Sequence, residues 1–340
     1  MTYDVITIGT VTRDVFLKSG DFQVVKNSNY RTGRAGCFML GTKLEIPKVA
    51  IASGGGGTNT AVGFARQGLK TATIGRIGKD EVGKEIIEEM KKEGVESLFQ
   101  IDQEHDTAYS TILVAQDGER TILEYRGAND YMSENNTDWE KLKSKWVYID
   151  SLGGNEKLLA KILEWAKSNN SKTAFNPGKR LIKLGIGLHK YLDGVDILLV
   201  NEDESAYIAD IEYNEEREPE VFKKLDDVIR GIVVMTKGPR GVEVSDGKKH
   251  YLAGIPDSPI VDRTGAGDSF GSGFVAGYIH GTQNLKHEAE IIEYAIQLGT
   301  ANATSVVQYF GAKQGLLKNG EWGNYPKVKV KVENILKLIK

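Results

Sequence analysis

The chain has 340 residues, of which 40% are hydrophobic and 27% are charged, a composition typical of a folded globular protein. Its formal net charge of −3, without a long run of lysine or arginine, argues against general binding to nucleic acid or anionic membranes. Cys37 is the only cysteine, which excludes an intrachain disulfide or a thiolate metal cluster, so we expect a reducing cytoplasm. No apolar run approaches the ~18 residues of a membrane span.

Strand and helix patterns alternate along most of the chain. Short apolar strands are predicted at 5–8, 71–77, 146–150, 174–176, 195–200 and 232–236. Helices are predicted at 58–68, 80–93, 156–168, 218–230, 268–281 and 288–307. This alternation favours an α/β fold with a doubly wound, mostly parallel sheet, and we expect residues 1–340 to form a single domain.

Two stretches in the first third interrupt this rhythm. Residues 16–53 contain no convincing helix, and 107–126 predict a hairpin around Asp117-Gly118. We expect about 14–52 and 106–127 to form a small β-sheet lid that excludes water from a site beneath it. The exposed edges of such a lid would allow a homodimer.

The most informative motif is Thr264-Gly265-Ala266-Gly267-Asp268, which opens a predicted helix. A glycine-rich turn at a helix start presents free backbone N–H groups and the positive end of the helix dipole, which suits a phosphoryl group. Asp268 places a second negative charge there and is typical of a base aimed at an incoming hydroxyl. An ordinary capped helix after a flexible loop is the alternative.

A second glycine cluster, Gly54–Gly57, leads into another predicted helix. Consecutive glycines remove side chains where a ligand or another backbone comes close, although a flexible loop with a helix cap would read the same. Asn59 can point its amide at a polyol. Asp14 follows the first strand, where ligands gather in open α/β sheets, and can accept hydrogen bonds from sugar hydroxyls. A loop Asp that caps its own backbone is the alternative.

Two weaker motifs follow later strands. Asn201 and Glu204 could organise water around Mg²⁺, but a helix capping box has the same letters. Residues 236–241 offer a hydroxyl, a cation and exposed backbone suited to nucleotide phosphates; a tight turn is the alternative. Residues 78–85 nearly match a phosphate-binding P-loop, but Glu85 stands in place of the Ser or Thr that would hold Mg²⁺, so we reject that match.

Together these residues resemble the ribokinase (PfkB) family of carbohydrate and nucleoside kinases, from Tyr3 to about Leu317. The order and separation of the two glycine motifs make the resemblance specific. It implies a ribokinase-like α/β domain with a β-sheet lid, and ATP-dependent phosphorylation of a primary hydroxyl on a sugar or nucleoside.

The resemblance also implies roles for individual residues. Asp268 would be the catalytic base, and the anion hole would be formed by the amides of Gly265, Ala266 and Gly267. The acceptor's hydroxyls would be held by Asp14, Gly54, Gly55 and Asn59. Mg²⁺ and its water would be positioned by Asn201 and Glu204. The nucleotide phosphates would be bordered by Thr236, Lys237, Gly238 and Gly241. Asn302 would close the adenine pocket, and a K⁺ site would be lined by Asp262 and Thr264.

Three departures from the family pattern concern the acceptor and the cation. Gly56 stands where ribokinases and sugar-phosphate kinases commonly carry Lys, which disfavours a phosphorylated acceptor. Ribokinases place a Glu after the strand predicted at 146–150, where this chain has Ser151-Leu152-Gly153. Arg263 replaces a small residue beside the expected K⁺ site.

Two other function classes compete with a kinase. A non-catalytic sugar or nucleoside sensor could keep the fold. A nucleotide-binding oxidoreductase is disfavoured because residues 9–12 lack the GxGxxG turn.

Overall fold

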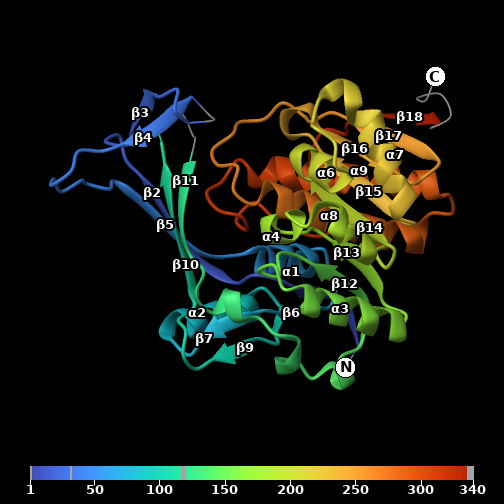
Figure 1. Ribbon diagram of the computed structural model, residues 1–340, viewed down its shortest axis with the longest axis horizontal. Coiled ribbons are helices and arrows are strands. Elements are labelled where there is room, and N and C mark those ends of the chain that lie inside the picture. The colour runs from blue at the N-terminus through green and yellow to red at the C-terminus, as the bar shows by residue number, and fades with distance from the viewer. Residues whose placement is uncertain (1, 31–32, 116–119, 335–340) are drawn as a thin grey trace.

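The computed structural model describes residues 2–30, 33–115 and 120–334. Its main sheet has ten strands in the order β18-β17-β16-β15-β14-β13-β12-β1-β6-β8 (Figure 1). Seven of them run parallel: β1 (Tyr3–Ile8), β6 (Thr71–Ile74), β8 (Glu96–Ser97), β12 (Ser144–Ile149), β13 (Lys172–Phe175), β14 (Ile197–Asn201) and β15 (Ile232–Thr236). Three antiparallel strands extend one edge: β16 (Val242–Ser245), β17 (Lys249–Ala253) and β18 (Val330–Asn334). The predicted mostly parallel α/β sheet is confirmed.

Helices cover both faces of this sheet. One face packs against α3 (Glu156–Ser168), α6 (Glu202–Ala209) and α7 (Glu218–Val228). The other face packs against α1 (Gly56–Arg66), α8 (Ala266–Asn284) and α9 (Glu288–Val306). Successive side chains of a strand point to opposite faces of its sheet, so each strand contributes to both hydrophobic cores. In β12, Val147 and Ile149 pack in the core on the α3, α6 and α7 side, and Tyr148 packs in the core on the α1, α8 and α9 side. The remaining helices are α2 (Glu81–Lys92), α4 (Lys179–Ile182) and α5 (His189–Leu192).

Glycines at four-residue spacing let α8 and α9 approach closely. A Cβ atom added at Gly273 would lie 3.0 Å from the Cα of Gly299, and one at Gly277 would lie 2.8 Å from the Cα of Ala295. Residues four apart share one face of a helix, so these glycines form a groove along α8 that receives α9. This packing fixes the position of the α8 N-terminus at one end of the sheet.

A second, four-stranded sheet stands beside the main body (Figure 1). Its strands, in the order β11-β10-β2-β5, are β2 (Thr12–Lys18), β5 (Lys48–Gly54), β10 (Ala108–Val114) and β11 (Arg120–Tyr125). A further hairpin, β3 (Gln23–Lys26) with β4 (Arg34–Cys37), extends it. These strands come from the two inserted segments, and the expected turn at Asp117-Gly118 lies outside the described residues. We call the strands β2, β3, β4, β5, β10 and β11 the lid.

Some elements differ from the sequence prediction. The strand predicted at 71–77 is divided into β6 and β7 (Arg76–Gly78), which pairs with β9 (Gln100–Asp102). The hairpin β16–β17 and helix α6 were not predicted. The rejected P-loop match runs into α2, where the Asp80 side chain caps the helix by accepting a hydrogen bond from the N–H of Gly83. Within the described residues, none of the helices has the length and hydropathy that a membrane crossing requires.

Candidate active site

The N-terminus of α8 is built as an anion-binding turn. Its N-cap is Gly265, whose φ of 75° lies in the left-handed region that favours glycine. The first helical hydrogen bond runs from the N–H of Ser269 to the Gly265 carbonyl, at 2.8 Å. Of the three amides predicted to form the anion hole, that of Ala266 donates to the Arg263 carbonyl at 3.3 Å, whereas among the described residues the N–H groups of Gly265 and Gly267, and that of Asp268, have no hydrogen-bond partner. A Cβ atom at Gly267 would meet nothing within 4 Å, so the space in front of these amides is open.

The two glycine motifs meet at this point, because α1 packs against α8. A Cβ atom at Gly63 would lie 2.3 Å from the Ser272 Oγ, which shows how closely the two helices approach. One turn earlier, the Nδ2 of Asn59 donates a 2.7 Å hydrogen bond to the Oδ2 of Asp268. Asp268 retains an accessible face. Burial raises the pKa of its carboxyl, although Asn59 and the charge of Lys313 oppose the rise.

Asp14 reaches the site from the lid. The sequence predicts Asp14 in the loop after the first strand, but the residue lies within β2. A Cβ atom at Gly54 would lie 1.9 Å from the Asp14 Oδ2, so this glycine is required for the carboxylate to turn toward α1. Burial raises the pKa of Asp14 to about 6 against the attraction of Lys313 and a hydrogen bond with Ser110. Gly55, with φ 87°, makes the turn into α1.

Asp150 was missed as a site residue because it was taken as the end of a strand. Strand β12 ends at Ile149, so the acidic residue Asp150 directly follows the strand. It lies one residue before Ser151, the first residue after the predicted strand. A Cβ atom at Gly56 would lie 1.9 Å from the Asp150 Oδ1. Burial and the negative charge of Asp268 raise the pKa of Asp150 well above its ordinary value. The carboxylate of Asp150 thus lies where a side chain at position 56 would begin.

Lys313 was also missed. It comes from the segment after α9 and is only 9% exposed. Its Nζ donates hydrogen bonds to the Ser53 carbonyl (2.6 Å), the Thr58 Oγ1 (2.9 Å) and the Asn59 Oδ1 (2.7 Å). No local spacing rule could have found it, since its partners lie more than 250 residues earlier in the chain.

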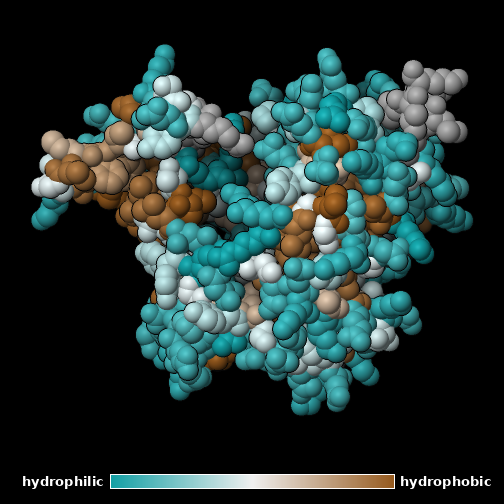
Figure 2. Space-filling model, in the orientation of Figure 1, coloured by the Kyte–Doolittle hydropathy of each residue, from teal (hydrophilic) through white to brown (hydrophobic). Residues whose placement is uncertain are grey.

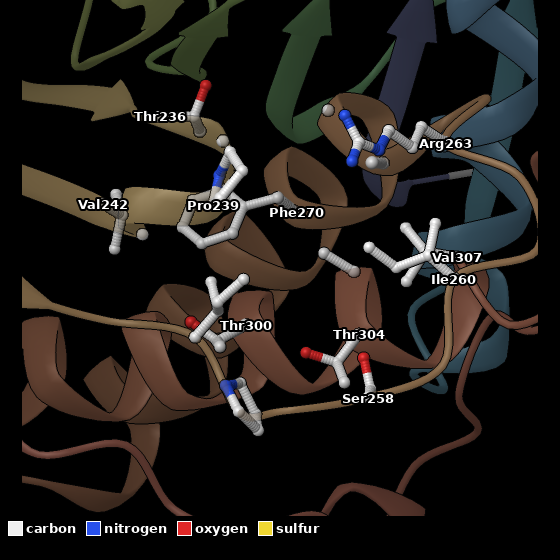
Figure 3. Close-up of a pocket in the computed structure, with 17 residues that line it drawn as sticks. Thr236, Pro239, Val242, Ser258, Ile260, Arg263, Phe270, Thr300, Thr304 and Val307 are labelled. Atoms are coloured by element: carbon white, nitrogen blue, oxygen red, sulfur yellow. The ribbon is translucent and has the colours of Figure 1, made fainter. Parts of the chain in front are cut away.

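A largely apolar cavity of about 250 Å³ begins beside the α8 N-terminus (Figure 3). Its lining includes Ala266, Gly267 and Phe270 of α8. Figure 3 labels Phe270 and Pro239 among its lining side chains, together with Thr300 and Thr304 of α9. Flat apolar walls of this kind suit a stacked aromatic base. Thr236, Gly238 and Gly241, which belong to the turn predicted to border the phosphates, also line the cavity.

Two residues predicted for the nucleotide site are used elsewhere. Lys237 turns into the protein, where its Nζ forms 2.9 Å ion pairs with Glu218 and with Glu243. Asn302 is not among the described residues that line the cavity. Its Nδ2 donates to the Ser269 carbonyl and its Oδ1 accepts from the N–H of Leu317. A polar residue near a ligand site can equally serve packing between elements, and a contact of either residue with the nucleotide stays a prediction.

Asn201 and Glu204 form the capping box that the sequence left open. The Asn201 Oδ1 accepts from the N–H of Glu204 at 2.9 Å, and the Glu204 Oε2 accepts from the N–H of Asn201 at 3.0 Å. Burial raises the pKa of Glu204, against the hydrogen bond from the Asn201 backbone and the charge of Lys179. Among the described residues, no three His, Cys, Asp or Glu side chains gather as metal ligands. A hydrated Mg²⁺ held mainly by phosphates and water fits such a site, with Glu204 as its protein contact.

Asp262 and Thr264 brace the loop before α8. The Asp262 Oδ1 accepts hydrogen bonds from the N–H and the hydroxyl of Thr264, at 2.9 and 2.8 Å. Its Oδ2 accepts from the N–H of Gly311 at 3.0 Å. The guanidinium of Arg120, from the lid, lies 4.0 Å from Asp262. These contacts already occupy both carboxylate oxygens and supply a positive charge, so they fit a structural brace better than a K⁺ site.

Comparison with known proteins identifies the family of this chain. The sequence profile of the pfkB family carbohydrate kinases matches residues 29–319. The chain belongs to the PfkB family. As a member, it is a sugar or nucleoside kinase, a phosphotransferase with an alcohol acceptor.

Individual relatives and solved structures cover most of the chain, from 75% to 95% of it. The ribokinase of Haemophilus influenzae is 31% identical over 81% of this chain and 88% of its own length. An uncharacterized sugar kinase of Archaeoglobus fulgidus is 26% identical over 75% of this chain and 98% of its own length. The structure of Giardia lamblia ribokinase superposes with a TM-score of 0.78 at 20% identity, covering 95% of this chain and 98% of that one. The ribokinase-like fold is therefore confirmed.

Proposed function

We propose that this kinase transfers the γ-phosphate of ATP to the primary hydroxyl of an uncharged sugar or nucleoside. The observation that carries the proposal is the 2.7 Å hydrogen bond between Asn59 and Asp268, beside open backbone amides and an apolar cavity. The base of ATP would occupy the cavity, and its phosphates would extend toward Gly267. The ribokinase of Cryptococcus neoformans, 22% identical to this chain with a TM-score of 0.71, has a crystal structure in complex with ADP, which supports ATP as donor.

The reaction follows from this placement. The acceptor's CH₂OH would lie between Asp268 and the γ-phosphate. Asp268 accepts the hydroxyl proton as the new O–P bond forms and the bond to the β-phosphate oxygen breaks. The N–H groups of Gly267 and Asp268 stabilise charge on the transferring phosphoryl group. Mg²⁺, associated with Glu204 through water, would neutralise charge on the phosphates. We leave K⁺ out of the proposal because of the contacts at Asp262.

The charges around the acceptor position favour a neutral polyol. Asp14 and Asp150 are 9% and 6% exposed, and both have raised pKa values. The three N–H groups of the Lys313 ammonium are already used, so it offers no free donor to an anionic substrate. A phosphorylated or carboxylated acceptor would meet carboxylates without a compensating cation.

Two further parts of the proposal concern assembly and location. Val49 and Ile51, on the lid edge strand β5, are 51% and 63% exposed, and Figure 2 shows brown apolar side chains over the lid. We propose that this edge pairs with a second copy of the chain. The exposed free thiol of Cys37 suits a reducing cytoplasm.

Asp268→Asn tests the catalytic assignment. Asparagine keeps an oxygen that can accept from Asn59, so the fold should survive, but it cannot accept the proton. We expect kcat to fall ~10²–10⁴-fold, about 3–5 kcal/mol, with little change in KM for ATP. Turnover is measured as ADP release with neutral sugars and nucleosides as acceptors. Asp193→Asn, on an exposed residue, is the matched control. Near-wild-type turnover of the Asp268 variant would refute the assignment.

A further inference from the structure

Lys313 occupies a segment that is held rigidly. The guanidinium of Arg66 donates hydrogen bonds to the carbonyl of Lys313 at 2.8 Å and to that of Leu316 at 3.0 Å. The N–H of Gly311 is bound by Asp262, and the N–H of Leu317 by Asn302. The backbone on both sides of Lys313 is therefore tied to α1, to α9 and to the loop before α8. The position of its side chain is set by the fold.

The surroundings of the amine specify its charged form. Its three partners, the oxygens of Ser53, Thr58 and Asn59, are all acceptors at 2.6–2.9 Å. The Thr58 hydroxyl acts as an acceptor here because it donates its own hydrogen to the Gly54 carbonyl at 2.7 Å. A neutral amine has only two N–H groups and would leave one acceptor without a donor. The three contacts are thus satisfied only by an ammonium group.

These contacts determine how Asn59 presents itself to Asp268. The side-chain amide of Asn59 could turn either end toward the catalytic carboxylate. Because Lys313 donates to its Oδ1, the Nδ2 end faces Asp268 and donates to it. The reversed amide would place an oxygen against a carboxylate oxygen and an NH₂ group against an ammonium. Lys313 therefore selects the orientation that favours ionised Asp268.

Lys313 also balances charge in this part of the site. Acidic groups that act on it come from three parts of the fold: Asp14 of β2, Glu89 of α2 with the C-cap residue Glu93, and Asp268 of α8. Burial lowers the pKa of Lys313 to about 8, while these carboxylates favour its charged form. Asp268 in turn acts on the neighbouring groups Asp14, Asp150 and Tyr148. Without the ammonium, Asp14 and Asp268 would lose the positive charge that favours their ionised forms.

We propose that Lys313 is a positioning residue for phosphoryl transfer: its ammonium locks the Asn59 amide and keeps Asp268 ionised as the base. The inference rests on the proposed function and assigns a role to a residue outside both glycine motifs. Lys313 acts through Asn59 and through its charge, because its three N–H groups are committed to the protein.

Lys313→Met tests this role, since methionine is unbranched and uncharged. An opposite charge nearby typically lowers a carboxyl pKa by about 1–3 units, so its loss should move the acidic limb of the kcat profile about one unit upward. The limb is measured at saturating ATP and acceptor, where kcat reports groups in the enzyme–substrate complex. Activity should recover at pH values above the shifted limb. Lys313→Arg, which stays charged, should keep the limb at its wild-type position.

The controls separate the possible failures. Lys318→Met removes an exposed lysine from the same segment and should leave the limb unmoved. A uniform loss of kcat at all pH values in Lys313→Met, with an unshifted limb, would overturn the positioning role. If circular dichroism shows that Lys313→Met does not fold, Lys313→Gln takes its place, and failure of both to fold would assign Lys313 to structure alone. If wild type phosphorylates no neutral acceptor, the proposed function fails instead.

Discussion

Gly265 and Gly267 flank the same turn, but the structure predicts opposite consequences for replacing each with alanine. Gly267 has no atom within 4 Å of an added Cβ, and it lies in the first turn of α8. Alanine is favoured over glycine in helices by up to about 1 kcal/mol, so Gly267→Ala should fold at least as well as wild type. Its methyl group would enter the space assigned to the γ-phosphate. A displacement of about 1 Å in a reacting group can cost ~10²-fold in rate, and we expect kcat/KM for ATP to fall on that scale.

Gly265→Ala should damage the fold first. A left-handed backbone costs alanine about 1–2 kcal/mol. Its Cβ would also lie 2.2 Å from the Cβ of Ala312, and such overpacking costs about 1–3 kcal/mol. With about 2.1 cal/mol/K of unfolding entropy per residue, 340 residues give about 0.7 kcal/mol/K, so Tm should fall by roughly 3–7 °C.

Thermal unfolding by circular dichroism and ADP-release kinetics, run on both variants, separate the two roles. The expected pattern is an inactive but stable Gly267→Ala protein and a destabilised Gly265→Ala protein. Wild-type kinetics in Gly267→Ala would show that the phosphoryl group does not approach these amides, and the proposed reaction geometry would be wrong.

The remaining predictions concern Lys237 and the lid. Lys237→Met should lower Tm by about 4–7 °C, because removing one partner of a buried ion pair costs about 3–5 kcal/mol. We expect a shift at the low end of this range, because Glu243 keeps a 2.8 Å contact with His250. Its KM for ATP should stay within a few-fold of wild type, whereas an unchanged Tm with a tenfold rise in KM would make Lys237 a phosphate ligand. Val49→Lys with Ile51→Lys should convert a dimer to a monomer in sedimentation velocity at micromolar concentration, and a monomeric wild-type protein would contradict pairing through β5.

Local patterns predicted the features that depend on local chemistry. The two glycine turns, the helices after them and the parallel sheet follow from residues that are neighbours in the chain, although both helices begin two residues before the predicted starts at 58 and 268. The contact between Asn59 and Asp268, 209 positions apart, agrees with the placement that the family resemblance gave these residues. That resemblance, and not spacing, is what related the two motifs.

The residues that were missed or misplaced depend on partners distant in the sequence. Lys237 follows a strand, as a phosphate ligand would, but Glu218 and Glu243 draw its amine into the protein. Asp150 was missed because the predicted strand ended at residue 150, one residue beyond the observed end of β12, and strand ends are uncertain in a sequence. Lys313 lies in a segment without a helix or strand pattern, and its role exists only once that segment is placed against α1.

In the reaction centre that we propose, the donor and acceptor sides are built from different chemistry, and this explains which part of the function a sequence reveals. The donor side uses backbone N–H groups and apolar walls such as Phe270, which require glycine at fixed positions and so produce a recognisable motif. The acceptor side uses side chains from separate elements, Asp14 from the lid and Asp150 from the end of β12, whose identity can change without altering the fold. Phosphoryl transfer is therefore readable from the motif, whereas the acceptor is encoded in the charges that surround it. On the proposed function, the carboxyl groups of Asp14, Asp150 and Asp268, beside a Lys313 ammonium whose donors are already used, would favour hydroxyl groups over anions.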